Sequence, residues 1–186
     1  AANLPTGRCF ADGATLLFIL RGTMQTAQEI ITQSDTADDQ VSLDYDARFM
    51  RRKVLTTHAG AQILVDLPRT TSLDHGDALR TTTGLLVEIV AAPEPLLEIT
   101  GTDLSRIAWH IGNRHTPCQI ETARLLIQHD HVMADMLARI GAQVTEVHEP
   151  FTPEGGAYGH GRTHGHDHSH AHGPGAEHAH EHHNEH

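Results

Sequence analysis

The hydrophobic positions between residues 41 and 92 follow the two-residue period of β-strands. Four short apolar-rich runs are separated by turn residues such as Pro68, Gly76 and Gly84. The runs are VSLDY (41–45), RKVLTT (52–57), QILVDL (62–67) and LLVEIV (85–90). No long helical period interrupts them, so residues 24–92 are predicted to form a small all-β domain.

The second half mixes strand and helix periods. Asp103 and Asp130 can cap two helices, which Gly112 and Gly141 would end. The predicted elements are a strand at LLEIT (96–100), a helix at LSRIAWHI (104–111), strands at PCQIE (117–121) and ARLLIQ (123–128), a helix at VMADMLARI (132–140) and a strand at AQVTEV (142–147). The order β-α-β-β-α-β over 93–150 is the ferredoxin-like pattern, and the whole chain is predicted to be α+β.

Three segments fall outside these domains. Ala92-Pro93-Glu94-Pro95 reads as a linker, because proline removes a backbone donor and biases its predecessor away from helix. Residues 151–186 are rich in Gly, Pro, His and acid and are predicted to be a disordered tail. The pattern of 1–23 breaks off just before Met24, which we expect to be the natural start. The alternative, a strand at Leu16–Leu20, stays open.

Composition limits both stability and partners. Aromatic residues make up only 4% of the 186 residues, so each domain has a thin core, for which oligomerisation is one remedy. A net charge of −11 argues against nucleic acid, and the short basic cluster Arg51-Arg52-Lys53 is interpreted as an exposed strand edge. The longest apolar run, 14–20, is too short to span a membrane. Two distant cysteines without a CxxC favour a cytoplasmic protein.

Histidine is the residue whose chemistry stands out, with eighteen copies, eleven of them after Tyr158. Neutral imidazole is a ligand for nickel, zinc and copper, and its reference pKa of about 6.5 predicts that metal affinity falls as the solution is acidified through that range. The tail ligands are His160, His164, His166, His168, His170, His172, His178, His180, His182, His183 and His186. They are interleaved with other residues, unlike a purification tag. They supply many metal ligands but no fixed coordination geometry, because nothing orients the rings.

Two stretches of the folded body offer better organised ligands. His129 and His131 flank Asp130, and in an extended backbone residues two apart point to the same side. The alternative to metal binding is that the two histidines are only exposed polar residues at a strand-to-helix turn, with Asp130 as the helix cap. In HIGNRH, His110 lies on the predicted helix and His115 beyond it. A lone loop histidine is often only solvated, but a two-fold dimer would double it into a ligand pair.

No catalytic constellation accompanies these histidines. The sequence has no GxSxG, Walker loop or HExxH motif. Cys118 follows His115 by three residues but has no third, orienting group in view. The chain is therefore not expected to be an enzyme.

Three motifs together resemble the UreE family of nickel-carrying urease accessory proteins. They are HIGNRHTPCQI, HDHVMADML and FTPEGGAYGHG followed by the histidine-rich end, and the resemblance covers residue 41 to the C-terminus. It implies a homodimer formed through ferredoxin-like domains similar to copper chaperones, each preceded by a β domain similar to a chaperone peptide-binding domain.

The resemblance also implies residue roles. His115 would meet its twin across the dimer interface and bind Ni²⁺ with further ligands from the tail, while His129 and His131 match positions that bind additional metal in some members. The ion would pass to the GTPase of the urease maturation complex and to apo-urease. Zn²⁺ or Cu²⁺ at the same or additional sites, a metal-buffering role without a recipient, and peptide binding by the β domain remain alternatives.

Overall fold

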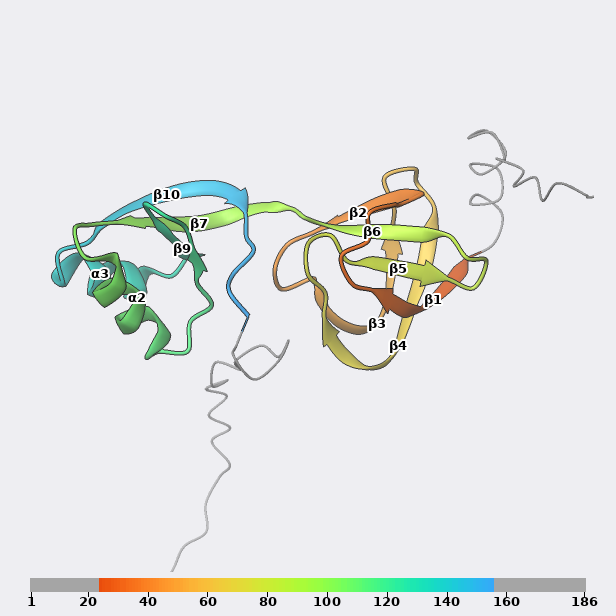
Figure 1. Cartoon of the computed structure of the whole chain (residues 1–186), viewed down its shortest axis with the longest axis horizontal. Helices are drawn as coiled ribbons and strands as arrows, with labels where there is room; N and C mark the ends of the chain where they lie inside the picture. The colour runs from red at the N-terminus through yellow and green to blue at the C-terminus, as the bar shows by residue number, and fades with distance from the viewer. Residues whose placement is uncertain (1–23, 156–186) are drawn as a thin grey trace, which may run out of the picture.

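The computed structural model describes residues 24–155, which form two sheets that follow one another along the chain (Figure 1). The first sheet contains β1 (Gln25–Ile31), β2 (Asp39–Leu43), β3 (Phe49–Thr56), β4 (Gln62–Ser72), β5 (Ala78–Thr81) and β6 (Leu86–Ala91). The second lobe contains β7 (Pro93–Thr100), α2 (Leu104–Gly112), β8 (Gln119–Ile120), β9 (Leu125–Gln128), α3 (His131–Arg139) and β10 (Gln143–Pro150). The predicted tail histidines after residue 158 and the predicted segment 1–23 lie outside the described residues.

The first sheet is curled around an aliphatic core. Its strand order is β2-β6-β5-β1-β4-β3, with β1 parallel to β4 and β2 parallel to β6. Alternation explains the core, since Ile63, Val65 and Leu67 of β4 are at most 3% exposed while their neighbours face outward. The small all-β domain predicted from the strand period is therefore found, with a core that is aliphatic as the composition indicated.

Strand β3 lies at the edge of this sheet, and its Arg51, Arg52 and Lys53 are exposed. The interpretation of this basic cluster as a strand edge is confirmed. The pairing of β3 with β4 shifts register between Met50 and Arg52. Charge and a register irregularity are both devices that discourage pairing with a further strand.

Two strands of the first sheet have no counterpart in the predicted elements. In β1 the buried positions are Gln25 and Ala27, a polar and a small residue, so the strand shows no apolar alternation. Strand β5 is only four residues long. Both lie in the middle of the sheet, where pairing on two sides compensates for weak local preference.

The second lobe has the ferredoxin-like order β7-α2-β8-β9-α3-β10, which confirms the predicted α+β fold class. Both helices begin where their caps predicted. The Asp103 carboxylate accepts from Arg106 N at 3.0 Å, and Asp130 Oδ1 accepts from Val132 N at 2.7 Å and Met133 N at 3.1 Å. Neither helix of the described chain is long and apolar enough to cross a membrane.

The prolines do not make 92–95 an irregular linker, as their presence predicted, because Pro93 and Pro95 belong to β7. They pair with Pro150 and His148 of β10. The carbonyl of Pro95 accepts the N–H of His129 at 3.3 Å, just beyond the end of β9. The backbone nitrogen and carbonyl of a strand residue face the same neighbouring strand. The nitrogen of Pro95, which has no hydrogen to donate, therefore faces β9 just beyond its last residue.

The second sheet buries residues on both faces. The face under the helices includes Leu97, Ile99, Ile107, Ile111, Leu125, Ile127, Met133 and Leu137. The opposite face buries Leu96 and Leu126 beneath Phe151, which is 0% exposed. The composition assigned residue 151 onward to a disordered tail, but Phe151 fills this apolar face and so holds the chain to the sheet.

Candidate metal-binding site

His115 lies in the connection between α2 and β8, as its position after the helical pattern predicted. Its backbone is left-handed, with φ of 56°, and its N–H donates to the Gly112 carbonyl at 2.9 Å. A positive φ is uncommon for a residue other than glycine and marks a tight turn here. The turn leaves the side chain exposed. An exposed imidazole on a fixed turn is accessible to an ion without disrupting helix packing.

His110 lies one turn and a half earlier, on α2 itself. It is half-buried, and its ring packs edge-on against Trp109 with centroids 4.9 Å apart. Its carbonyl accepts from Arg114 Nη1 at 3.3 Å. The His110 ring is therefore packed against Trp109, and residue His115 is exposed.

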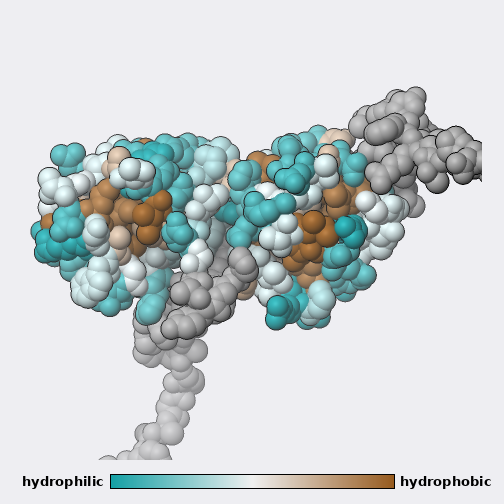
Figure 2. All heavy atoms as spheres, viewed as in Figure 1, coloured by the Kyte–Doolittle hydropathy of each residue, from teal (hydrophilic) through white to brown (hydrophobic). Residues whose placement is uncertain are grey.

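Exposed apolar side chains accompany the helices and β8. Trp109 is 63% exposed, Val132 62% and Ile120 53%. Figure 2 shows hydrophobic residues on the surface of the lobe that carries α2 and α3. Single exposed apolar residues are ordinary, and Trp109 has the largest apolar surface to offer among these three. These residues form the candidate surface for the predicted dimer.

His129 and His131 are brought to the start of α3 and are both exposed. His129 follows β9 directly, and its Nε2 lies 3.2 Å from Glu146 Oε1. Asp130 is extended, with φ of −146° and ψ of 116°, and His131 is the first helical residue. The cap assigned to Asp130 is confirmed, while shared metal binding by the two histidines stays a prediction.

His148 was not singled out by its sequence position. It pairs with Pro95 in the sheet, and Pro95 in turn accepts from His129, so both histidines flank the same proline. Directly opposed residues share a face, which also holds Glu146 two residues from His148. The register of β10 with β7, rather than sequence spacing, places His148 near His129.

Among residues 24–155, no three His, Cys, Asp or Glu side chains are already grouped to hold an ion. The body alone therefore offers separate imidazoles rather than a closed cage. Metal binding by His115, His129 and His131 stays a prediction.

Cys118 is unsuited to be a ligand in this state. Burial, and then the nearby Glu154 carboxylate, raise the pKa of its thiol to about 11. The thiolate is the metal-binding form, and it is scarce at neutral pH when the pKa is so high. Cys118 packs against the helix-side core, one residue before β8.

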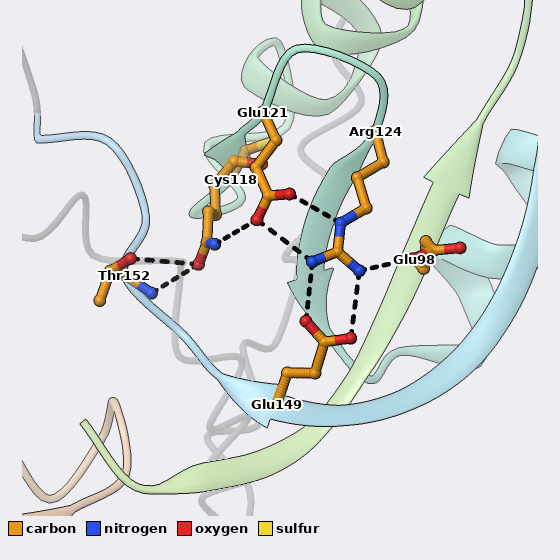
Figure 3. Close-up of polar contacts among 7 residues, drawn as sticks. Glu98, Cys118, Glu121, Arg124, Glu149 and Thr152 are labelled. Carbon is orange, nitrogen blue, oxygen red and sulfur yellow. Dashed lines mark hydrogen bonds and ion pairs between the residues drawn. The ribbon is translucent and has the colours of Figure 1, made fainter.

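A cluster of ion pairs around Arg124 lies on the face of the second sheet that is turned away from the helices (Figure 3). Arg124 Nη1 donates to Glu98 Oε2 at 2.6 Å, its Nε to Glu121 Oε2 at 2.7 Å and its Nη2 to Glu149 Oε2 at 2.8 Å. These bonds hold the pKa of Glu121 and of Glu149 below the ordinary value. The cluster joins β7 and β10 to the connection between β8 and β9, which carries Glu121 and Arg124.

Comparison with known proteins covers both lobes. Residues 21–92 match the family described as "UreE urease accessory protein, N-terminal domain", and residues 94–186 match "UreE urease accessory protein, C-terminal domain". The chain is 67% identical over 129 residues to "Urease accessory protein UreE" of Ruegeria pomeroyi, covering 69% of this chain and 87% of that protein. The protein of the same name in Rhodobacter capsulatus is 56% identical over 129 residues, covering 69% and 82%.

A β domain followed by a ferredoxin-like domain with exposed histidines is thus the arrangement of a urease accessory protein. The chain belongs to the UreE family. Its family role is in urease maturation, and the family is one of accessory proteins rather than enzymes.

Proposed function

We propose that this protein is a nickel metallochaperone that binds Ni²⁺ through His115 and delivers it, in the cytoplasm, for urease assembly. The ion would pass through the urease accessory GTPase to apo-urease. Family membership supports a role in urease maturation, and the residue chemistry supports nickel as cargo. The observation that carries the assignment of His115 is its exposed side chain on a left-handed turn beside the exposed apolar surface of α2.

A two-fold dimer through the second lobe would complete the site. Trp109 and Val132 offer apolar surface for it, and His115 lies six residues after Trp109 along the same helix and turn. An axis near this turn doubles each group beside it, so two His115 rings can face one ion. Dimerisation then creates the ligand pair that a single chain lacks.

Histidine ligands suit delivery. Imidazole binds nickel without the softness of thiolate, which would favour copper(I) or hold the ion too firmly. The raised thiol pKa of Cys118 leaves the neighbouring histidines as the available donors. His129 and His131, with the tail histidines after residue 158, would collect further ions, including Zn²⁺ or Cu²⁺. Collection by the tail and delivery by His115 are separate tasks.

Nickel titration tests the assignment of His115. His115→Ala should remove the tightest site while preserving most of the bound ions, because the other imidazoles remain. His58→Ala is the matched control, since His58 is also exposed but lies in the first sheet bonded to Ser42 at 2.9 Å. Equal loss of tight binding in both variants, or in neither, would exclude His115 as the delivering ligand.

A metal buffer that stores nickel, zinc or copper is the competing function, because eleven tail histidines exceed what one delivery site requires. Both functions predict several ions per chain. Only delivery predicts a nickel-dependent complex with the urease accessory GTPase. Co-purification of the two proteins with Ni²⁺, compared with a nickel-free control, separates them.

A further inference from the structure

The first domain and the second lobe are connected by a crossing of one residue. Ala92 lies between Ala91, which ends β6, and Pro93, which begins β7 (Figure 1). Its N–H donates to the Leu43 carbonyl of β2 at 2.9 Å. Two domains joined in this way are expected to move relative to each other unless further contacts hold them. The turn between β2 and β3 supplies such contacts, and its residues 44–48 are here called the latch turn.

The latch turn is braced by its own domain. Asp44 Oδ1 accepts from the Ala47 N–H at 2.7 Å, and the Asp44 carbonyl accepts from the Arg48 N–H at 3.2 Å. The Arg48 carbonyl accepts from the N–H of Leu73, just beyond β4, at 3.0 Å. The groups that the turn presents to the second lobe therefore stand on a fixed backbone.

The first contact across the two lobes is made to a buried carboxylate. Tyr45 N donates to Glu94 Oε1 at 2.7 Å, and Glu94 belongs to β7 and is only 8% exposed. The other oxygen, Oε2, accepts from Gln128 Nε2 of β9 at 3.1 Å. Carboxylates are rarely buried unless their oxygens have partners. Glu94 obtains one donor from each lobe, so both donors are in place while the lobes are docked.

The second contact is made to Phe151, which packs on the second sheet against Leu96 and Leu126. The ring of Tyr45 meets that of Phe151 edge-on at 5.3 Å, and the guanidinium of Arg48 donates to the Phe151 carbonyl. Arg48 is 2% exposed, and its Cζ lies 5.5 Å from the centroid of the Tyr45 ring. A buried cation of the first domain thus ends on the backbone of the second lobe.

We propose that the latch turn locks the first domain and the second lobe into one rigid body. Apolar contacts tolerate sliding, whereas hydrogen bonds are directional, and here a backbone donor and a buried cation both reach across. A macromolecule that binds the first domain would then be held at a fixed orientation to the second lobe. This inference goes beyond the proposed function, because it holds whichever ion the protein carries.

Residual dipolar couplings of the backbone amides, measured on the full chain, test the rigidity directly. A latched protein requires that a single alignment tensor fit the amides of residues 25–91 and of residues 93–150 together. The fit within each lobe checks that the lobe itself is folded. Separate tensors of different magnitude for the two lobes of the parent protein would overturn the proposal.

Hydrogen exchange of the Tyr45 amide tests the individual contacts, because this N–H reaches water when it leaves Glu94. Arg48→Met should accelerate the exchange about tenfold to a hundredfold, which is the effect of losing one hydrogen bond to a charged group. Gln128→Leu should also accelerate it, although the change is made in the second lobe. Arg52→Met is the matched control and should leave the rate unchanged, since the partner of Arg52 is Asp66 of the same sheet at 3.9 Å.

Exchange of the Ala47 amide and of the amides of β4 reports whether the latch turn and the first domain stay folded. If Arg48→Met loses this protection, Gln128→Leu decides alone, because its substitution lies outside the first domain. An unchanged Tyr45 rate in Gln128→Leu or in a folded Arg48→Met would show that the first domain by itself protects this amide. That result, or an equal acceleration in Arg52→Met, would refute the latch.

Discussion

Truncating Trp109 should dissociate the proposed dimer. Trp109 is 63% exposed in the single chain. Taking about 250 Å² for a whole tryptophan, about 160 Å² is available for burial against a second copy, worth at most about 4 kcal/mol per chain. Burial of half that area gives about 2 kcal/mol per chain and about 4 kcal/mol per dimer. Trp109→Ala should therefore raise the dimer Kd about a thousandfold.

Sedimentation equilibrium across nanomolar to micromolar concentrations measures this shift. Val54→Ala is the control, because Val54 is 47% exposed but lies on the edge strand of the first sheet. The Tm of the dissociated variant should stay close to that of the parent monomer, since Trp109 is not part of the core. An unchanged dimer Kd for Trp109→Ala, or an equal shift for Val54→Ala, would refute this placement of the interface.

Three other changes have defined outcomes. Removing residues 158–186 should sharply lower the Ni²⁺ count per dimer in calorimetry but leave at least one ion, and a count of zero would contradict the His115 pair. Phe151→Ala should lower the unfolding free energy by about 3–5 kcal/mol in urea melts, because the ring is 0% exposed. A loss below 1 kcal/mol would show that the Phe151 ring contributes little to the packing of this face. Arg124→Met should have a lower free energy of unfolding than the parent at neutral pH, and this difference should shrink as pH falls below about 4.5. The reason is that Arg124 lowers the pKa of Glu121 and of Glu149, so its stabilising effect is present above that pH and is lost as these carboxylates protonate. Melts at pH 7 and pH 3.5 that show a constant deficit would remove this electrostatic role.

Local pattern was sufficient for the two helices of the second lobe but only partly for its first strand, for Phe151 and for the first sheet. The helices at α2 and α3 combine an aspartate cap with an apolar stripe, and both signals lie within one short segment. Strand β1 buries the polar Gln25 and the small Ala27, neither of which favours a strand locally. Only pairing with β4 and β5 on both sides makes it a strand.

The prolines at 93 and 95 illustrate the same limit. Proline signals a break when the chain is considered alone, but here its missing donor falls where β9 has ended. The position of a strand's end relative to its neighbour is a property of the whole sheet. The sequence segment 92–95 could not reveal it.

Single histidines could be named from sequence, while their neighbours could not. His115, His129 and His131 stood out because of motif and spacing. His148 and Glu146 join His129 only through the register of β10 with β7. The contact of Thr152 with Gln119 spans 33 residues and depends on a side-chain amide that no spacing rule predicts.

Urease activation under limiting nickel tests the central claim most directly. Apo-urease, the accessory GTPase and nucleotide would be combined with nickel-loaded parent, His115→Ala or the chain lacking 158–186, at equal total Ni²⁺. If His115 delivers the ion, His115→Ala should activate urease no faster than free Ni²⁺ does. The shortened chain should still activate urease, but each nickel-loaded chain should activate fewer urease molecules. Normal activation by His115→Ala together with failure of the shortened chain would show that the tail, not His115, delivers the ion.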